Sequence, residues 1–253
     1  MHPKRLYAHR GASAERPENT LPAFERALEI GVDALEMDVH ATRDGRLVVA
    51  HDDTAQRMCG ARLAWADLDL HDAQALDAGW GFVARDGTRP FAGAGFHVPT
   101  FDDVLESFPT TRLNVDLKNP ASIPLALELI RRHHAEDRVT LAAFDTRTAV
   151  AVRRAGYAGD TGLSQGEMAT LLGLPALAWR QLPFTGNAAQ VPLSYGPIHF
   201  DRPAFIAKCH SLGLRVDFWT IDDPAEAARL LALGADGIMT NDPAAIRPAF
   251  HSS

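Results

Sequence analysis

The feature that most constrains this 253-residue chain is a regular alternation of short strand-like runs and helix-like segments. The sequence predicts strands at Arg5–His9, Ala34–Val39, Arg46–Ala50, Arg112–Leu117, Val139–Phe144, Arg215–Thr220 and Gly237–Thr240. Helical patterns are expected at Thr20–Ile30, from Asn119-Pro120 through Ile130, at Thr146–Ala155, from a cap at Asp201 to Gly213, from a cap at Asp223 to Gly234, and from Pro243 onward. Repeated strand–helix units predict a parallel sheet. About eight such units, in a chain of this length, favour the α/β class and a closed (β/α)8 TIM barrel.

Two features refine this prediction. An open doubly wound sheet would show similar alternation, but no Gly-x-Gly-x-x-Gly follows the first strand. Residues 53–98 are glycine-rich and show little patterning beyond a short helix near Trp65–Leu76. We interpret them as a small insertion after the second barrel strand, over one end of the barrel. The sequence therefore predicts one barrel domain over residues 1–253, with an insertion at about 53–98.

Charge and cysteine content exclude several classes of protein. The chain has 25 basic and 32 acidic side chains, a formal charge of −7, and no Lys/Arg cluster that could neutralise a nucleic-acid backbone. No apolar run approaches the ~20 residues that span a bilayer, so we expect no stable membrane insertion. The two cysteines lack metal-ligand spacing and no signal-peptide region opens the chain, which favours a reduced, cytoplasmic protein.

Carboxylates gather at the ends of two predicted strands. Because strand side chains alternate, Glu36 and Asp38 project to one face, and Asp116 and Lys118 project together from a second strand. Three carboxylates without a cysteine form a hard-oxygen site, which suits one divalent cation such as Mg²⁺, Ca²⁺ or Mn²⁺. Each acid taken alone could instead be a solvated or capping carboxylate.

Two histidines lie where barrel enzymes carry their chemistry. His9 ends the first strand and His51 ends the strand 46–50, at the rim formed by the carboxyl ends of the strands. Near neutral pH one imidazole can accept a proton while the other donates one. Arg10 and Lys118 offer a guanidinium fork and a point charge for an oxyanion such as phosphate. The other histidines lack such neighbours and are assigned no role: His2, His40, His71, His97, His133, His134, His199, His210 and His251.

Taken in order, these and further motifs resemble the glycerophosphodiester phosphodiesterase family. The matching motifs are His9-Arg10-Gly11, Pro17-Glu18-Asn19-Thr20, Glu36-x-Asp38, Asp44-Gly45, His51-Asp52, Leu76-Asp77-Ala78-Gly79, Pro99-Thr100, Asp116-Leu117-Lys118, Trp219-Thr220 and Asp236-Gly237-Ile238-Met239-Thr240-Asn241-Asp242-Pro243. The resemblance covers nearly the whole chain. It implies a (β/α)8 barrel with a small insertion after the second strand.

The resemblance also implies roles for particular residues. It identifies metal ligands (Glu36, Asp38, Asp116), an acid–base pair (His9, His51) and phosphate contacts (Arg10, Lys118). Many members have Glu where this chain has Asp116, whose shorter side chain could bind through a water or favour another metal. By this resemblance, Asp at this place is associated with a subset of lysophospholipid-cleaving relatives, which leaves the substrate class open. Trp219 could form an aromatic wall for the substrate or pack in the core, and Glu18 and Asn19 could act directly or only shape a loop and cap.

The implied reaction is metal-dependent hydrolysis of a small glycerophosphodiester to an alcohol and glycerol 3-phosphate, within lipid and glycerol metabolism. By resemblance, the substrate's own hydroxyl attacks and gives a cyclic phosphate that water opens. Which histidine is acid and which is base stays open, as do the headgroup, the metal and the oligomeric state.

Three alternatives remain. A lysophospholipase D would need an apolar groove, which the insertion could supply through Phe82, Phe91, Phe96 and Val98. A barrel aldolase would use Lys118 as a Schiff base. A non-catalytic phosphodiester-binding protein would be expected to lack a histidine or a metal acid, whereas this chain keeps the full set.

Overall fold

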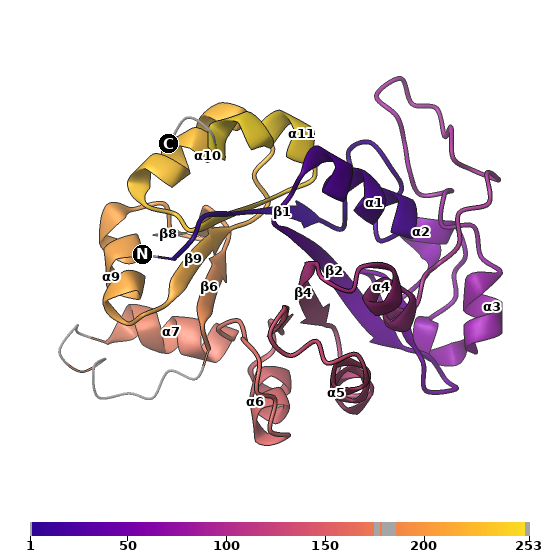
Figure 1. Cartoon of the computed structure of the whole chain (residues 1–253), viewed down its shortest axis with the longest axis horizontal. Coiled ribbons are helices and arrows are strands. Elements are labelled where there is room, and N and C mark those ends of the chain that lie inside the picture. The colour runs from indigo at the N-terminus through magenta and orange to yellow at the C-terminus, as the bar shows by residue number, and fades with distance from the viewer. Residues whose placement is uncertain (1, 175–177, 179–185, 251–253) are drawn as a thin grey trace.

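The computed structural model describes residues 2–174, 178 and 186–250, and shows a curled parallel sheet with helices around its outside (Figure 1). The strands are β1 Arg5–His9, β2 Ala34–Ala41, β3 Leu47–Val49, β4 Arg112–Leu117, β5 Val139–Ala142, β6 Ala188–Val191, β7 Ser194–Tyr195, β8 Ile198–His199, β9 Arg215–Phe218 and β10 Gly237–Thr240. The helices are α1 Leu21–Ile30, α2 Gln56–Cys59, η1 Trp65–Asp67, α3 Leu70–Gln74, α4 Phe101–Ser107, α5 Ser122–Arg132, α6 Thr146–Arg154, α7 Gln165–Gly173, α9 Pro203–Ser211, α10 Pro224–Leu233, α11 Pro243–Ile246 and η2 Arg247–Phe250.

The parallel sheet closes into a barrel through a very short eighth segment. Its strand order is β5-β4-β2-β1-β10-β9-β6, and every neighbouring pair is parallel. Between β5 and β6, Thr161 pairs with Leu141, and Gly162 pairs with Ala188, as single parallel bridges. The predicted (β/α)8 barrel is therefore confirmed, with two residues at the eighth strand position.

Local signals in the sequence set the boundaries of the helices. The Thr20 side chain accepts a hydrogen bond from the Ala23 amide at the start of α1, and Gly31 ends this helix with φ 89°. The predicted pairing across the Asp44-Gly45 turn is also confirmed, since β3 runs antiparallel to β2.

The predicted cap at Asp201 is wrong. Proline occupies the first turn of α9, so the N-cap is the residue directly before it, Arg202, whose side chain makes no capping bond. Asp201 lies one residue too early and accepts a hydrogen bond from Arg229 at 2.7 Å instead. In α10 the aspartate directly precedes the proline, and the Asp223 carboxylate accepts from the Glu226 amide at 2.9 Å as predicted.

Apolar side chains pack the barrel strands against the surrounding helices. One core cluster joins β2, β4 and β5 to α1, α4 and α5, and a second joins β6, β9 and β10 to α9 and α10. All eight residues of β2 are buried. Leu35, Met37 and Val39 belong to the first cluster, which leaves Glu36 and Asp38 on the other face of the strand. This strand thus carries two carboxylates into the interior of the barrel.

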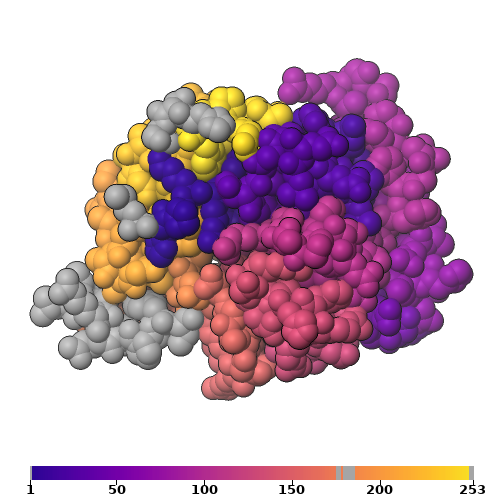
Figure 2. Space-filling model, in the orientation of Figure 1, coloured from indigo at the N-terminus to yellow at the C-terminus, as the bar shows by residue number. Residues whose placement is uncertain are grey.

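The insertion has a small core of its own, centred on Trp65, whose side chain is only 1% exposed. The helix predicted near Trp65–Leu76 is divided into η1 and α3. In the space-filling view the insertion forms one side of the molecule and lies against the N-terminal segments (Figure 2). None of the helices in the described part of the chain is both long and apolar enough to cross a membrane.

Candidate active site

The structure brings all eight predicted site residues to one cavity of about 260 Å³. They line it together: His9, Arg10, Glu36, Asp38, His51, Asp116, Lys118 and Trp219. Glu36 and Asp38 lie within β2, and the others lie near the carboxyl ends of strands or shortly after them, at the rim where barrel enzymes carry their catalytic groups.

A strained turn after β1 positions Arg10. Its φ of 59° lies in the left-handed region that few non-glycine residues adopt. The next residue, Gly11, also has positive φ, and a Cβ there would lie 2.7 Å from Ala23. The turn directs the Arg10 amide to the Glu36 carboxylate at 3.0 Å and its Nε to within 3.3 Å of an Asp38 oxygen. The turn therefore brings Arg10 into contact with both acids of β2.

Lys118 lies between two of the three acids. Asp38 and Asp116 are directly opposite each other in the register of β2 and β4. The Lys118 ammonium lies 2.7 Å from an Asp38 oxygen and 2.6 Å from an Asp116 oxygen. These two carboxylates can therefore reach one shared cation.

Burial acts to raise the pKa of all three carboxyl groups, and neighbouring charges decide the net direction for each. Burial raises the pKa of Glu36 well above its usual value, and the nearby Asp38 charge raises it further. Burial also raises the pKa of Asp116, despite the opposing charge of Lys118. Burial would raise the pKa of Asp38 too, but Lys118 and Arg10 outweigh it and leave this pKa below its usual value. The cavity thus concentrates more negative charge than the side chains of Arg10 and Lys118 offset.

His9 is oriented by a residue from the far end of the chain. Its Nδ1 lies 2.8 Å from Asn241 Oδ1, while the Asn241 amide nitrogen donates to Asp222 at 2.8 Å. Because that bond leaves Asn241 Oδ1 as an acceptor, His9 carries its proton on Nδ1. The other nitrogen, Nε2, lies 3.9 Å from a Glu36 oxygen. Burial lowers the pKa of His9, and the charge of Arg10 lowers it further, so a neutral ring is favoured.

The second histidine, His51, follows β3. Its Nδ1 lies 2.6 Å from the carboxylate of Asp52, and its side chain is 36% exposed. Asp52 contacts the ring from outside the cavity lining. Each histidine therefore has one nitrogen held by an oxygen acceptor.

The wall of the cavity combines the predicted Trp219 with residues that the sequence did not reveal. Phe144 is 60% exposed and Trp219 is 37% exposed, so Trp219 is not a core residue. Deeper in the cavity, Gln190 donates to Asn114 at 2.8 Å. Asn114 could have been found, because it has the same strand parity as Asp116. Gln190 lies in the stretch between 161 and 195, where the sequence pattern is weakest.

The apolar residues suggested for an insertion groove do not reach this cavity. None of Phe82, Phe91, Phe96 and Val98 lines it. Phe91 instead packs edge-on against Phe82 and Phe96, with ring centres 4.9 and 5.1 Å apart. These aromatic side chains therefore stabilise the insertion.

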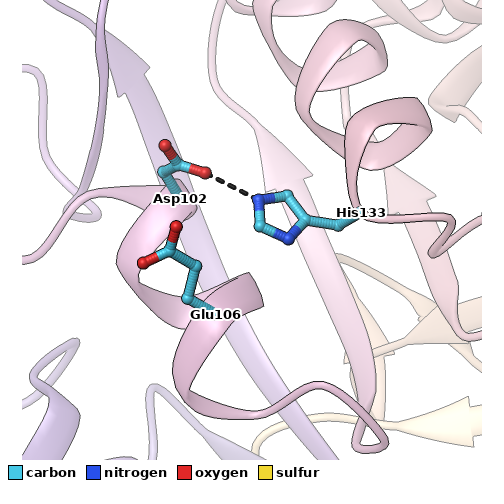
Figure 3. Close-up of side chains that lie close together, drawn as sticks. All are labelled: Asp102, Glu106 and His133. Atoms are coloured by element: carbon cyan, nitrogen blue, oxygen red, sulfur yellow. Dashed lines mark hydrogen bonds and ion pairs between the residues drawn. The ribbon is translucent and has the colours of Figure 1, made fainter.

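A separate group of potential ligands lies on the helices outside the barrel. Among the described residues, only Asp102, Glu106 and His133 place three ligand atoms within 4.8 Å of one another (Figure 3). The Asp102 carboxylate accepts from His133 and from Arg132, each at 2.7 Å. Both donors lie at the end of α5, so we interpret this group as an ion-pair contact between α4 and α5. It lies outside the cavity lining.

Comparisons with known proteins agree with this geometry. The model of the "Glycerophosphoryl diester phosphodiesterase family" matches residues 9–245. "Probable glycerophosphodiester phosphodiesterase 2" of Mycobacterium tuberculosis is 33% identical, over 92% of this chain and 86% of that protein. A lysophospholipase D of Homo sapiens is 26% identical, over 97% of this chain and 85% of its own length.

Solved structures share the fold. A phosphodiesterase of Oleispira antarctica, determined with the product sn-glycerol-3-phosphate, superposes with a TM-score of 0.80 at 22% identity. The match covers 98% of this chain and 96% of that one. At this level of identity the likeness concerns the fold.

Proposed function

The chain belongs to the glycerophosphoryl diester phosphodiesterase family, and from this premise we propose that its cavity hydrolyses small glycerophosphodiesters to an alcohol and glycerol 3-phosphate. The observation that carries the proposal is the convergence of three carboxyl groups, two cationic side chains and two histidines on one cavity of about 260 Å³. The protein is an enzyme, a phosphoric diester hydrolase. The residue roles below are part of our proposal.

The acids of the cavity have the donor chemistry that a divalent cation prefers, although their oxygens are not gathered within 4.8 Å of one another as the ligand atoms of Asp102, Glu106 and His133 are. Glu36, Asp38 and Asp116 supply only oxygen donors, which hard cations such as Mg²⁺ and Ca²⁺ prefer. Next to Asp38, the buried Oδ1 of Asn19 has no hydrogen-bond partner among the described residues. We propose that the three acids would hold one divalent cation, whose positive charge would acidify the attacking hydroxyl and offset the charge of the phosphate. The side chain of Asp116 is shorter than the Glu that many family members have at this place. Activity with Mg²⁺, Ca²⁺ and Mn²⁺ should therefore be compared.

Arg10 and Lys118 bind the anionic oxygens of the diester. A phosphodiester resists attack because its oxygens are negative, so fixed positive groups that hold this charge lower the barrier. Both side chains line the cavity and are already held by acids, Arg10 by Glu18 at 3.2 Å and Lys118 by Asp38 and Asp116. This arrangement limits their rotation before substrate arrives.

We assign the base to His9 and the acid to His51. His9 is buried, its pKa is lowered, and its unprotonated Nε2 can take the proton of the glycerol hydroxyl next to the phosphate. His51 lies against the Asp52 carboxylate, which stabilises the charged imidazolium that protonates the departing alcohol.

Substrates with different leaving groups test this assignment. His9→Ala and His51→Ala should each lose about 10²–10⁴-fold in turnover of glycerophosphocholine, because each loses a proton-transfer group. A p-nitrophenyl diester of glycerol 3-phosphate needs no acid to protonate its leaving group. On that substrate we expect His51→Ala to recover most of its activity and His9→Ala to stay impaired.

The opposite rescue would reverse the two roles, and near-normal activity of either variant on glycerophosphocholine would refute the acid–base pair. Activity of the wild-type protein should also disappear with EDTA and return with added divalent cation. Circular dichroism of each variant checks that the fold is intact.

The lysophospholipase D alternative has one observation in its favour. Phe144 and Trp219 offer exposed aromatic surface beside the acids, where an acyl chain could lie. Turnover of lysophosphatidylcholine against glycerophosphocholine, measured on one preparation, separates the two substrate classes.

The aldolase alternative is disfavoured by the state of Lys118. Burial lowers its pKa, but the charges of Asp116 and Asp38 raise it more, so the net pKa lies above the usual value. A Schiff base needs a neutral amine, and this lysine stays an ammonium ion. A binding-only role is disfavoured by the presence of both histidines beside the acids.

We also propose a cytoplasmic location. It is supported by the two cysteines, Cys59 and Cys209, which are unpaired and buried. Paired cysteines would be expected in an oxidising compartment.

A further inference from the structure

A network of ion pairs connects the insertion to both sides of the cavity. At its centre is Arg57, in the insertion helix α2. Its Nε donates to Asp52 Oδ2 at 2.7 Å and its Nη2 to Glu18 Oε1 at 2.9 Å. Its Nη1 also donates to Glu18 Oε2. The three nitrogens of one guanidinium group therefore hold two carboxylates from two different loops.

The first branch of this network ends on His51. Asp52 accepts from Arg57 on Oδ2 and lies 2.6 Å from the ring nitrogen Nδ1 of His51 through Oδ1. An ionised carboxylate only accepts hydrogen bonds, so Nδ1 of His51 is a donor. In the neutral ring this leaves Nε2 without a proton, and His51 lines the cavity.

Asp52 keeps its negative charge because of its partners. Partial burial would raise its pKa, but hydrogen bonds from Arg57 and His51 lower it to about 2. The carboxylate is 36% exposed, so water competes for it unless a second group fixes its rotation. The fork of Arg57 provides that constraint, and Trp65 Nε1 holds the Asp52 carbonyl at 2.8 Å.

The second branch ends on Arg10. Glu18 Oε1 accepts from Arg57 Nη2 and from Arg10 Nη1, at 2.9 and 3.2 Å. Glu18 is thus shared between the insertion and the proposed phosphate contact. A second ion pair of the same kind can serve as a control. Arg43 donates two hydrogen bonds to Asp69 of the insertion, at 2.9 and 2.7 Å, and neither residue lines the cavity.

We propose that Arg57 is a positioning residue, which fixes the Nδ1–H tautomer of His51 through Asp52 and the direction of Arg10 through Glu18. The inference rests on the proposed function for its kinetic consequences only. The tautomer of His51 is a property of the protein without substrate, so it can be measured whether or not the diesterase assignment holds.

Four variants separate the two branches. We expect Arg57→Gln to lower kcat about 10- to 100-fold, the loss typical of groups that orient catalytic ligands, and to raise KM. Asp52→Ala should lower kcat with little change in KM, because only the orientation of His51 is lost. Glu18→Gln should mainly raise KM, through Arg10. Arg57→Lys keeps the charge without the fork, so it should recover only part of the kcat.

The tautomer provides the second readout. In ¹H–¹⁵N spectra of the neutral imidazole rings, wild-type His51 should be the Nδ1–H form. Arg57→Gln and Asp52→Ala should shift it toward the Nε2–H form, whereas Glu18→Gln and the matched control Arg43→Gln should leave it unchanged.

The inference is overturned if Arg57→Gln keeps the wild-type tautomer, kcat and KM, even when its melting temperature falls, because Arg57 would then serve stability alone. If Arg57→Gln does not fold, Asp52→Ala breaks the same link from the other end and decides by the same measurements. Absence of diesterase activity in the wild-type protein would instead refute the proposed function and leave the tautomer result standing.

Discussion

At the scale of single residues, the cavity depends on side chains whose charges are fixed by partners beside them. Asp52 is the clearest case, because its pKa of about 2 lies below the usual 3.8. A carboxyl group with a lower pKa in the folded than in the unfolded chain stabilises the fold above its unfolded pKa. That contribution is lost as the pH falls through the folded value.

Asp52→Ala should therefore make stability less dependent on pH in acid. The side chain is 36% exposed and solvent screens its ion pairs, so we expect a contribution of about 1 kcal/mol. Urea unfolding at about pH 5 and about pH 2 measures it: the wild-type free energy should fall by about 1 kcal/mol more than that of Asp52→Ala. Asp53→Ala is the control, since this neighbour is 91% exposed. Equal pH dependence in wild type and Asp52→Ala would contradict the prediction.

The cavity residues that could be predicted from the sequence are those placed by the alternation of side chains along a strand. Strand parity placed Glu36 and Asp38 together, and the register of β2 against β4 brought Asp116 opposite Asp38. The partners that orient these groups follow no local rule. Asn241 lies 232 positions from His9, and Glu18 lies 39 positions from Arg57, so only the closed barrel and the docked insertion reveal these contacts.

At the scale of elements, a helix start was predictable where a capping aspartate directly precedes a proline, as in α10 and α11, whereas the capped starts of α4 and α7 were not predicted. α9 and α10 show how finely the rule depends on position. Asp223 directly precedes Pro224 and caps its helix, whereas Asp201 is separated from Pro203 by Arg202 and cannot.

Two alanine substitutions test this difference. Asp223→Ala should destabilise the protein by about 1 kcal/mol, the usual loss for an N-cap. Asp201→Ala removes two ion pairs of solvent-accessible partners, with Arg229 at 2.7 Å and with His199 at 3.8 Å, and should cost about 0.5 kcal/mol or less. Thermal or urea unfolding measures the loss of unfolding free energy in both variants. Equal losses would show that the N-cap of Asp223 contributes no more than the ion pairs of Asp201.

At the scale of the whole molecule, the barrel has one weak place in its circumference. β2 and β4 pair over six register positions, whereas in the described part of the chain β5 and β6 are connected through the short segment 160–163, with one bridge on each side. A pairing of two residues leaves no periodic pattern, which is why the sequence did not predict a strand there. We propose that residues 1–253 form one domain that opens locally at this seam before it unfolds globally.

Amide hydrogen exchange checks this proposal. The amides of Gly162 and Leu163 bond to Leu141 and Ala188 across the seam. They should exchange at least tenfold faster than the amides of Met37 and Val115, because fewer neighbouring bonds must break for the seam to open. Equal protection of the two sets of amides would show that the barrel sheet is equally stable at the seam and between β2 and β4.

The pairing of β1 with β10 has a consequence for how the protein is made. The first barrel strand lies beside the last, with Ala8 opposite Thr240, although roughly 230 residues separate them. A ribosome adds about 5–20 residues per second, so β1 waits on the order of 10–45 s for this neighbour. Until then one edge of β1 is unpaired, and unpaired strand edges invite association between nascent chains. We therefore expect nascent chains to be open to association during the interval between the synthesis of these two strands.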